Sequence, residues 1–125
     1  NQASLDGASL DGASLNQASL DGASLNEASL NEASLNWVSL NRASLNRASL
    51  DGASLDGAIL NQANLDGASF DEASLDQVNL KTADLQDIIW DNNTNWSNVR
   101  RVDKIFDIPE ALRYPNDNRE LMEEE

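Results

Sequence analysis

The chain has 125 residues and a formal net charge of -14 at pH 7, and 40% of its residues are hydrophobic but only 5% aromatic. It contains no Cys and no His. This excludes disulfides and thiolate metal sites, and it removes the residues on which most zinc sites and most pairs of nucleophile and base depend. The negative charge argues against binding the phosphates of nucleic acid or of an anionic membrane, and no apolar run approaches the roughly 20 residues needed to span a bilayer.

A five-residue repeat runs through residues 1 to 85. Every fifth residue from Leu5 to Leu85 is Leu, except Phe70, and the residue two places earlier is Ala, except Val38 and Val78. Five residues turn an α-helix by about 140°, so the leucines would be spread around its circumference. In a straight strand, an odd repeat would put successive leucines on opposite faces. The backbone must therefore bend once in every unit and coil upon itself.

The two residues after each Leu are expected to form the bend. They are pairs such as Asp-Gly, Asn-Gln and Asn-Glu, which are typical of turns, and the glycines at 7, 12, 22, 52, 57 and 67 fall in the second turn position, where a positive φ is inexpensive for Gly. Each unit is thus a short side plus a corner, with Leu and Ala inside and Ser or Asn outside. This is an all-β solenoid.

The units Ala-Ser-Leu-Asp-Gly, Ala-Asn-Leu-Asp-Gly (63–67) and Ala-Asp-Leu-Gln-Asp (83–87) resemble the pentapeptide-repeat family. One departure is Ser before Leu in 13 units, where the family often has Asp or Asn. The resemblance implies a right-handed quadrilateral β-helix with four units per coil, hence about four to five coils. In that register Glu27 would pair with Arg47, and Phe70 and Trp90 would share a column with Leu10.

The pattern changes after Leu85, and we divide the chain into a β-helix over 1–90 and a cap and tail over 91–125. Residues 94–99 read as one more unit after a one-residue slip. Beyond it, the spacing of the apolar residues and Asp107 as an N-cap predict short α-helices laid over the last coil. The segment is similar to the tails of cyanobacterial pentapeptide-repeat proteins, which suggests a cyanobacterial origin. The expected core of the cap consists of Trp90, Trp96, Val102, Ile105 and Phe106.

Trp37, Arg42 and Arg47 are the candidate interaction patch, since an exposed Trp flanked by two Arg suits a contact hot spot; the alternative is outward variation without function. Asp51, Asp71 and Asp91 form one ladder that could be interpreted as a calcium site, but solvated charge is favoured because these side chains project outward. With no cleft and no nucleophile motif, we expect no enzyme activity and no cofactor or metal.

The favoured function is a structural or protein-interaction module whose partner is unknown. The alternative is a DNA mimic that inhibits a topoisomerase or another DNA-binding protein, as some family members do, because residues 1–85 carry about one net charge per 2 Å of their height, close to the duplex value of about one per 1.7 Å. A third reading is a regular-lattice binder such as an ice-binding solenoid, because serines would repeat at about 4.8 Å.

Two further expectations concern assembly and compartment. No cap is visible at the N-terminal end, so the chain is expected to be a monomer or a dimer stacked through its first coil. No signal peptide is visible either; the cytoplasm is favoured, with the thylakoid lumen or periplasm as alternatives. A natural repeat tract, a truncated one and a consensus design stay open.

Overall fold

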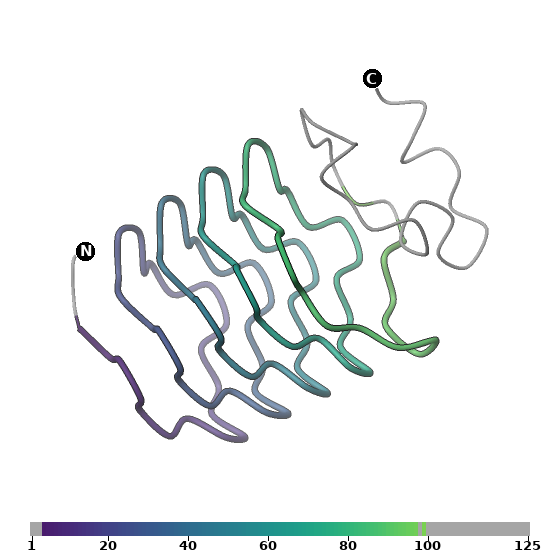
Figure 1. Ribbon diagram of the computed structural model, residues 1–125, viewed down its shortest axis with the longest axis horizontal. Coiled ribbons are helices and arrows are strands. Elements are labelled where there is room, and N and C mark those ends of the chain that lie inside the picture. The colour runs from purple at the N-terminus through teal and green to yellow at the C-terminus, as the bar shows by residue number, and fades with distance from the viewer. Residues whose placement is uncertain (1–3, 98, 100–125) are drawn as a thin grey trace.

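Coil-to-coil pairing at a fixed offset defines the architecture. In the computed structural model, which describes residues 4–97 and 99, isolated parallel β-bridges join Ser4 to Ser24, and the same offset of 20 holds up to the bridge between Ser69 and Ile89. Each coil therefore has four five-residue sides. Figure 1 shows the coils stacked in chain order. Within the described part there is no helix, and each bridge stands alone rather than in a longer strand.

We number the coils by this offset: coil 1 is residues 4–23, coil 2 is 24–43, coil 3 is 44–63, coil 4 is 64–83, and coil 5 begins at residue 84. The predicted bend in every unit is confirmed, because the Ala8 N–H donates to the Leu5 carbonyl at 3.0 Å and this turn recurs along the solenoid. The coils are joined by backbone hydrogen bonds such as those from Leu5 N–H to the Ser24 carbonyl at 2.6 Å and from Ser29 N–H to the Ala8 carbonyl at 2.8 Å.

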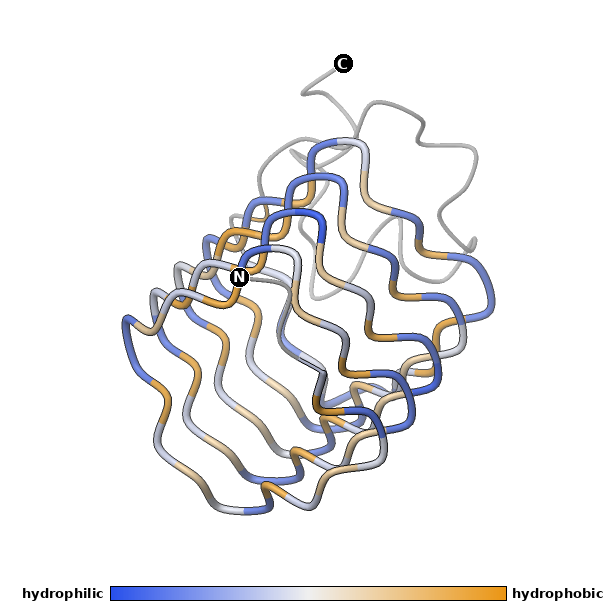
Figure 2. Cartoon of the chain, turned by 90° about the vertical axis from the view of Figure 1, so that its left-hand side faces the viewer, coloured by the Kyte–Doolittle hydropathy of each residue, from blue (hydrophilic) through white to orange (hydrophobic). Residues whose placement is uncertain are grey.

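The interior is built from the Ala and Leu positions, as predicted. From Ala23 to Leu80 these positions are buried, and Phe70 is fully buried in a Leu position. Figure 2 shows hydrophobic residues recurring at the same places in successive coils. The leucines of coil 1 are only half-buried because, among the described residues, coil 2 alone covers them. An apolar cavity of about 240 Å³ lies inside this end, and its lining is Leu5, Leu10, Leu15, Leu20, Leu25, Leu30, Leu35, Leu40 and Leu45.

The predicted one-residue slip is confirmed in coil 5. Ser74 pairs with Asn95, an offset of 21 rather than 20. Thr94 consequently occupies the Ala position and Trp96 the Leu position, and both are buried. The Thr94 hydroxyl donates to the Phe70 carbonyl at 2.8 Å, and the Trp96 ring packs edge-on against Phe70 at a centroid distance of 6.0 Å. The bridge ladder thus extends past residue 90.

Only part of the expected cap can be compared with the structure. Trp96 is buried, and Trp90 is half-buried against the core. Val102, Ile105 and Phe106, together with the predicted helices, lie outside the described residues.

Candidate functional site

From Gly7 to Asp87, the second residue of each corner lies in left-handed backbone whether or not it is Gly. The six glycines have φ between 70° and 75°, and eleven other residues in the equivalent position, Trp37 among them, have φ between 53° and 64°. The Gly pattern pointed to this conformation, but it did not show that Gln, Glu, Arg and Trp adopt it too. A bulky residue with positive φ is an outlier that costs of order 1–3 kcal/mol.

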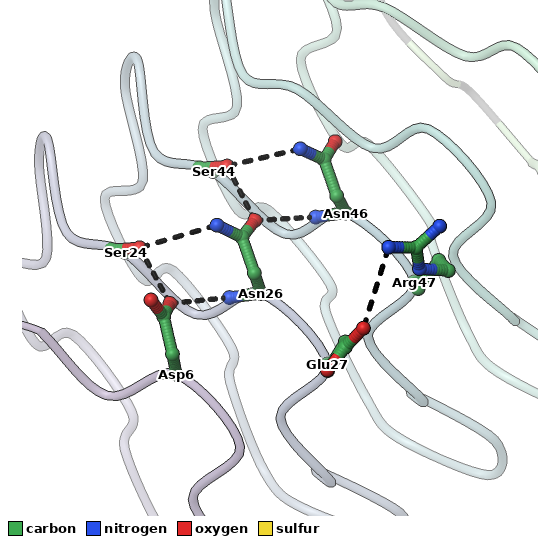
Figure 3. A network of polar contacts seen from close by, with 7 residues as sticks. All are labelled: Asp6, Ser24, Asn26, Glu27, Ser44, Asn46 and Arg47. Atoms are coloured by element: carbon green, nitrogen blue, oxygen red, sulfur yellow. Dashed lines mark hydrogen bonds and ion pairs between the residues drawn. The ribbon is translucent and has the colours of Figure 1, made fainter.

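The three residues of the candidate patch lie on successive corners of the coil. One side separates Trp37 from Arg42 and the next side separates Arg42 from Arg47, so Trp37 and Arg47 occupy opposite corners. The fold does not bring the three side chains to a common surface. Arg47 instead pairs with Glu27 across coils at 3.4 Å, which confirms the predicted ion pair (Figure 3). With side chains 73% and 63% exposed, such a pair stabilises the fold by only about 0–1 kcal/mol.

Trp37 rests on the backbone of the next coil. A Cβ atom added to Gly57 would lie 2.4 Å from Cε3 of the indole, so the ring occupies the space above this glycine. Gly57 is buried, whereas Trp37 itself stays 58% exposed. Ile59, 38% exposed, follows Gly57 by two residues and bridges to Ser39. We call Trp37, Gly57 and Ile59 the Trp37 surface.

From Ser24 onward, the serines before Leu or Phe donate to the corners of the preceding coil. Asp6 Oδ1 accepts the Ser24 hydroxyl at 2.5 Å and the Asn26 N–H at 2.9 Å, and Asn26 Oδ1 accepts from Ser44 and Asn46 at 2.5 and 3.0 Å in the same way (Figure 3). A hydroxyl that donates within the fold has no proton left for a lattice. This weighs against an ice-binding face, although the serines do form the regular columns on which that reading rested.

Acidic side chains gather on one corner of the solenoid. They are Asp11, Glu32, Asp51, Asp71, Glu72 and Asp91. Partial burial, followed by the charges of Asp51, Asp91 and Glu72, raises the pKa of Asp71. Hydrogen bonds, first from the Glu72 N–H, lower the pKa of Asp91.

No group of three or more acidic residues in the described part is arranged to hold a metal ion. The described residues form no helix with the length and apolar character of a membrane span.

Two outward apolar residues, Ile59 and Ile89, were missed by reasoning from the sequence. They are 38% and 51% exposed and occupy the Ser position of their units. The signal was present, because each interrupts a run in which this position is otherwise Ser, Asn or Asp.

The repeat is similar to a known family and to solved structures. The model of the pentapeptide repeats family matches residues 8–47 and 48–87, with eight copies, whereas no curated protein matches the chain. Among solved structures, a pentapeptide repeat protein from the thylakoid lumen of Arabidopsis thaliana is similar at a TM-score of 0.75 and 21% identity, over 90% of this chain and 73% of that one.

Two cyanobacterial structures from Nostoc are also similar. HetL, a pentapeptide repeat protein involved in the regulation of heterocyst differentiation, is 28% identical over 80% of this chain and 60% of that one, with a TM-score of 0.37. A second Nostoc pentapeptide repeat protein is 26% identical over 80% of this chain and 83% of that one, with a TM-score of 0.38. The ladder of bridges, together with the family match and the Arabidopsis structure, identifies the solenoid as a right-handed β-helix. The chain belongs to the pentapeptide repeat family.

Proposed function

We propose that the chain is a non-enzymatic module that binds another protein through its outer surface. The observation that carries this proposal is the Trp37 surface. Most outward positions hold small polar side chains engaged by their neighbours, whereas Trp37 is large, 58% exposed and at a φ of 61°. Ten other non-glycine corner residues have a similar φ, so exposure and residue type set Trp37 apart, and Trp is enriched among contact hot spots.

Ile59 extends this surface and replaces the Ser that would donate a hydrogen bond to Asn41 of the preceding coil. Asn41 Oδ1 keeps only the Asn61 N–H, at 3.2 Å. The outward Ser pattern is therefore broken by a β-branched residue two positions after Gly57, the glycine that the Trp37 ring covers. Such departures from the pattern are expected at functional sites.

The test is affinity capture from a cyanobacterial lysate with the full chain and with two single variants. Trp37→Ala removes the indole, whereas Arg42→Ala is the matched control, an outward substitution at the second residue of the adjacent corner. We expect a specific partner to be captured by the unaltered chain and by Arg42→Ala but not by Trp37→Ala. Identical profiles for all three would contradict the proposal.

A DNA mimic is the second candidate, and the acidic corner favours it. All six charged residues on that corner are acidic, so the negative potential is concentrated along one edge of the solenoid. Inhibition of gyrase supercoiling at micromolar protein would support this function. No inhibition at that concentration would remove it.

We also make proposals about the assembly of the protein, its compartment and its C-terminal cap. Stacking of two copies through coil 1 would bury the half-exposed leucines around the apolar cavity, and light scattering that finds only monomer would exclude it. We also propose that the segment after residue 99 forms helices over the last coil, and that the protein acts in the cytoplasm, with the thylakoid lumen or periplasm as the alternatives.

A further inference from the structure

From Asn26 to Gln86, the first corner residue of each unit has a backbone N–H that makes no backbone hydrogen bond, and a side-chain oxygen accepts it. In one arrangement the acceptor comes from the preceding coil. Asn31 Oδ1 accepts the N–H of Asp51, twenty residues later, at 3.1 Å, and it also accepts the hydroxyl of Ser49 at 2.5 Å. This arrangement ties two coils together through side chains, and where the residue before Leu is Ser, its hydroxyl adds a second bond to the same acceptor.

In the other arrangement the acceptor belongs to the same unit. Asn64, Asn79 and Asp84 stand where other units have Ser, and each accepts the N–H of the residue two places later, at 3.1 to 3.2 Å. Asn and Asp form such local turns readily. The corner amide is satisfied, but the side chains then make no link to the neighbouring coil at that corner.

The two arrangements are distributed unevenly along the chain. Between coils 1 and 2, serine hydroxyls donate across all four corners, at Ser24, Ser29, Ser34 and Ser39. Between coils 2 and 3 they do so at three corners, Ser44, Ser49 and Ser54, and between coils 3 and 4 at two, Ser69 and Ser74. In coil 5 the corresponding residues are Asp84, Ile89 and Asn95, and none of these described positions is Ser.

Three of the acceptors that have lost their serine are left with an unsatisfied oxygen, whereas Asn41 keeps the Asn61 N–H. Asn46, Asn61 and Asp71 each have a buried Oδ1 with no partner in the described part of the protein. The residues eighteen places later are Asn64, Asn79 and Ile89. The missing serine therefore removes a link between coils and also leaves a buried oxygen without a donor, which is unfavourable.

We infer that this serine seam gives the solenoid a graded coupling, strongest at coils 1 and 2 and weakest at coils 4 and 5, so that residues 84–97 open as a unit before the remainder unfolds. The backbone bonds across the last interface, from Leu65, Phe70 and Leu75 to residues of coil 5, would be released together. So would the Thr94 bond to the Phe70 carbonyl and the contact of Trp96 with Phe70. Local opening of this kind is a general property of folded chains, and repeat arrays depend on coupling between neighbours.

Native-state hydrogen exchange of the full chain tests the inference amide by amide. The reporters are the amides of Leu5, Leu10 and Leu15, which donate to coil 2, and those of Leu65, Phe70 and Leu75, which donate to coil 5. Plain fraying of an open end would make the first set the faster one, because the leucines of coil 1 are only half-buried. The seam predicts the reverse, with the second set exchanging at least about tenfold faster and at similar rates within the set.

A gain-of-link variant gives an independent readout. Ile89→Ser would place a hydroxyl opposite Asp71 Oδ1, and since Ile89 is 51% exposed little burial is lost. We expect slower exchange at Phe70, whose N–H donates to the carbonyl of residue 89, and a lower Asp71 pKa measured by NMR. Ile59→Ser is the matched control, which would fill the corresponding gap between coils 2 and 3 and leave the exchange of Phe70 unchanged.

Two results would overturn the inference. One is exchange at Leu5, Leu10 and Leu15 as fast as, or faster than, exchange at the last interface. The other is an Ile89→Ser protein that keeps its far-UV spectrum but shows no slowing at Phe70.

Discussion

The left-handed corner residue is the most demanding position of the repeat at the scale of single residues. Its side chain leans toward the next coil, as Arg47 does over Gly67 and Trp37 over Gly57. Whether a substitution is tolerated there depends on φ and on the residue twenty places earlier. The cost of the positive φ can be separated from the cost of a steric clash, because some glycines have open space where a Cβ would stand.

Gly57→Ala should destabilise the fold more than Gly12→Ala. Both glycines have positive φ, so Ala costs about 1–2 kcal/mol at either site. Nothing lies within 4 Å of a Cβ at Gly12, whereas at Gly57 the Trp37 ring lies at 2.4 Å. Urea denaturation should therefore show the larger loss for Gly57→Ala. In a Trp37→Ala background the two substitutions should become equal, and a persisting difference would count against this packing.

Asp71→Asn should raise the free energy of unfolding at neutral pH. The pKa of Asp71 is raised in the fold, chiefly by burial and then by Asp51 and Asp91, so the folded state holds the proton more tightly than the unfolded chain does. The charged form therefore opposes folding, and this effect develops as pH rises from the unfolded pKa through the raised folded pKa. The advantage of the Asn variant, measured by denaturation across pH, should shrink at acid pH.

Asp21→Asn serves as the control of opposite sign. The pKa of Asp21 is lowered, first by the Ser39 hydroxyl, so its charge stabilises the fold above the unfolded pKa. That contribution is lost as pH falls through the lowered folded pKa. The variant should be less stable than the parent protein at neutral pH, and a gain in stability there would contradict this assignment.

At the scale of the repeat unit, the serine before Leu acts as a connector between coils. The family resemblance led us to expect Asp or Asn at this site and to treat Ser as a minor departure facing solvent. The bend, the buried Leu and Ala and the one-residue slip near Thr94 could all be predicted from the sequence, because each depends on spacing along the chain. The Ser24 hydroxyl bond to Asp6 was not predicted, because the expected register aligns residues twenty apart, and this bond runs diagonally between residues eighteen apart.

Ser49→Ala should lower stability by about 1 kcal/mol, the net value of one hydrogen bond, because it removes the donor to Asn31. Ser14→Ala is the matched control, since Ser14 lies in coil 1 and has no preceding corner within the described part to receive its hydroxyl. Ser49→Asn should recover part of the loss through a local turn like that of Asn64. Equal midpoints of thermal unfolding for Ser49→Ala and Ser14→Ala would refute the connector role.

At the scale of the whole molecule, stability depends more on keeping the five-residue spacing of the inward Leu positions than on the number of residues in the solenoid. Deleting 31–35 removes one complete unit and leaves every later Leu pointing inward, so a β-type far-UV spectrum and a single unfolding transition should be retained. Deleting 31–34 removes one residue fewer but brings Leu30 next to Leu35 and shifts the inward positions. We expect a much lower midpoint of thermal unfolding for this shorter deletion. Similar midpoints for both deletions would show that the five-residue spacing is not required.

The sequence by itself determined the bend in every unit, the inward Leu and Ala and the solenoid class, because an odd repeat can share one interior only if the backbone turns once per unit. The expected register paired Glu27 with Arg47, but the tertiary structure decided the other contacts of the outward residues. It separated Trp37 from Arg47 on opposite corners, set the indole on Gly57 and left Asp71 without a donor. These outcomes depend on the offset of 20, and 21 at Asn95, and such an offset is fixed only when coils stack.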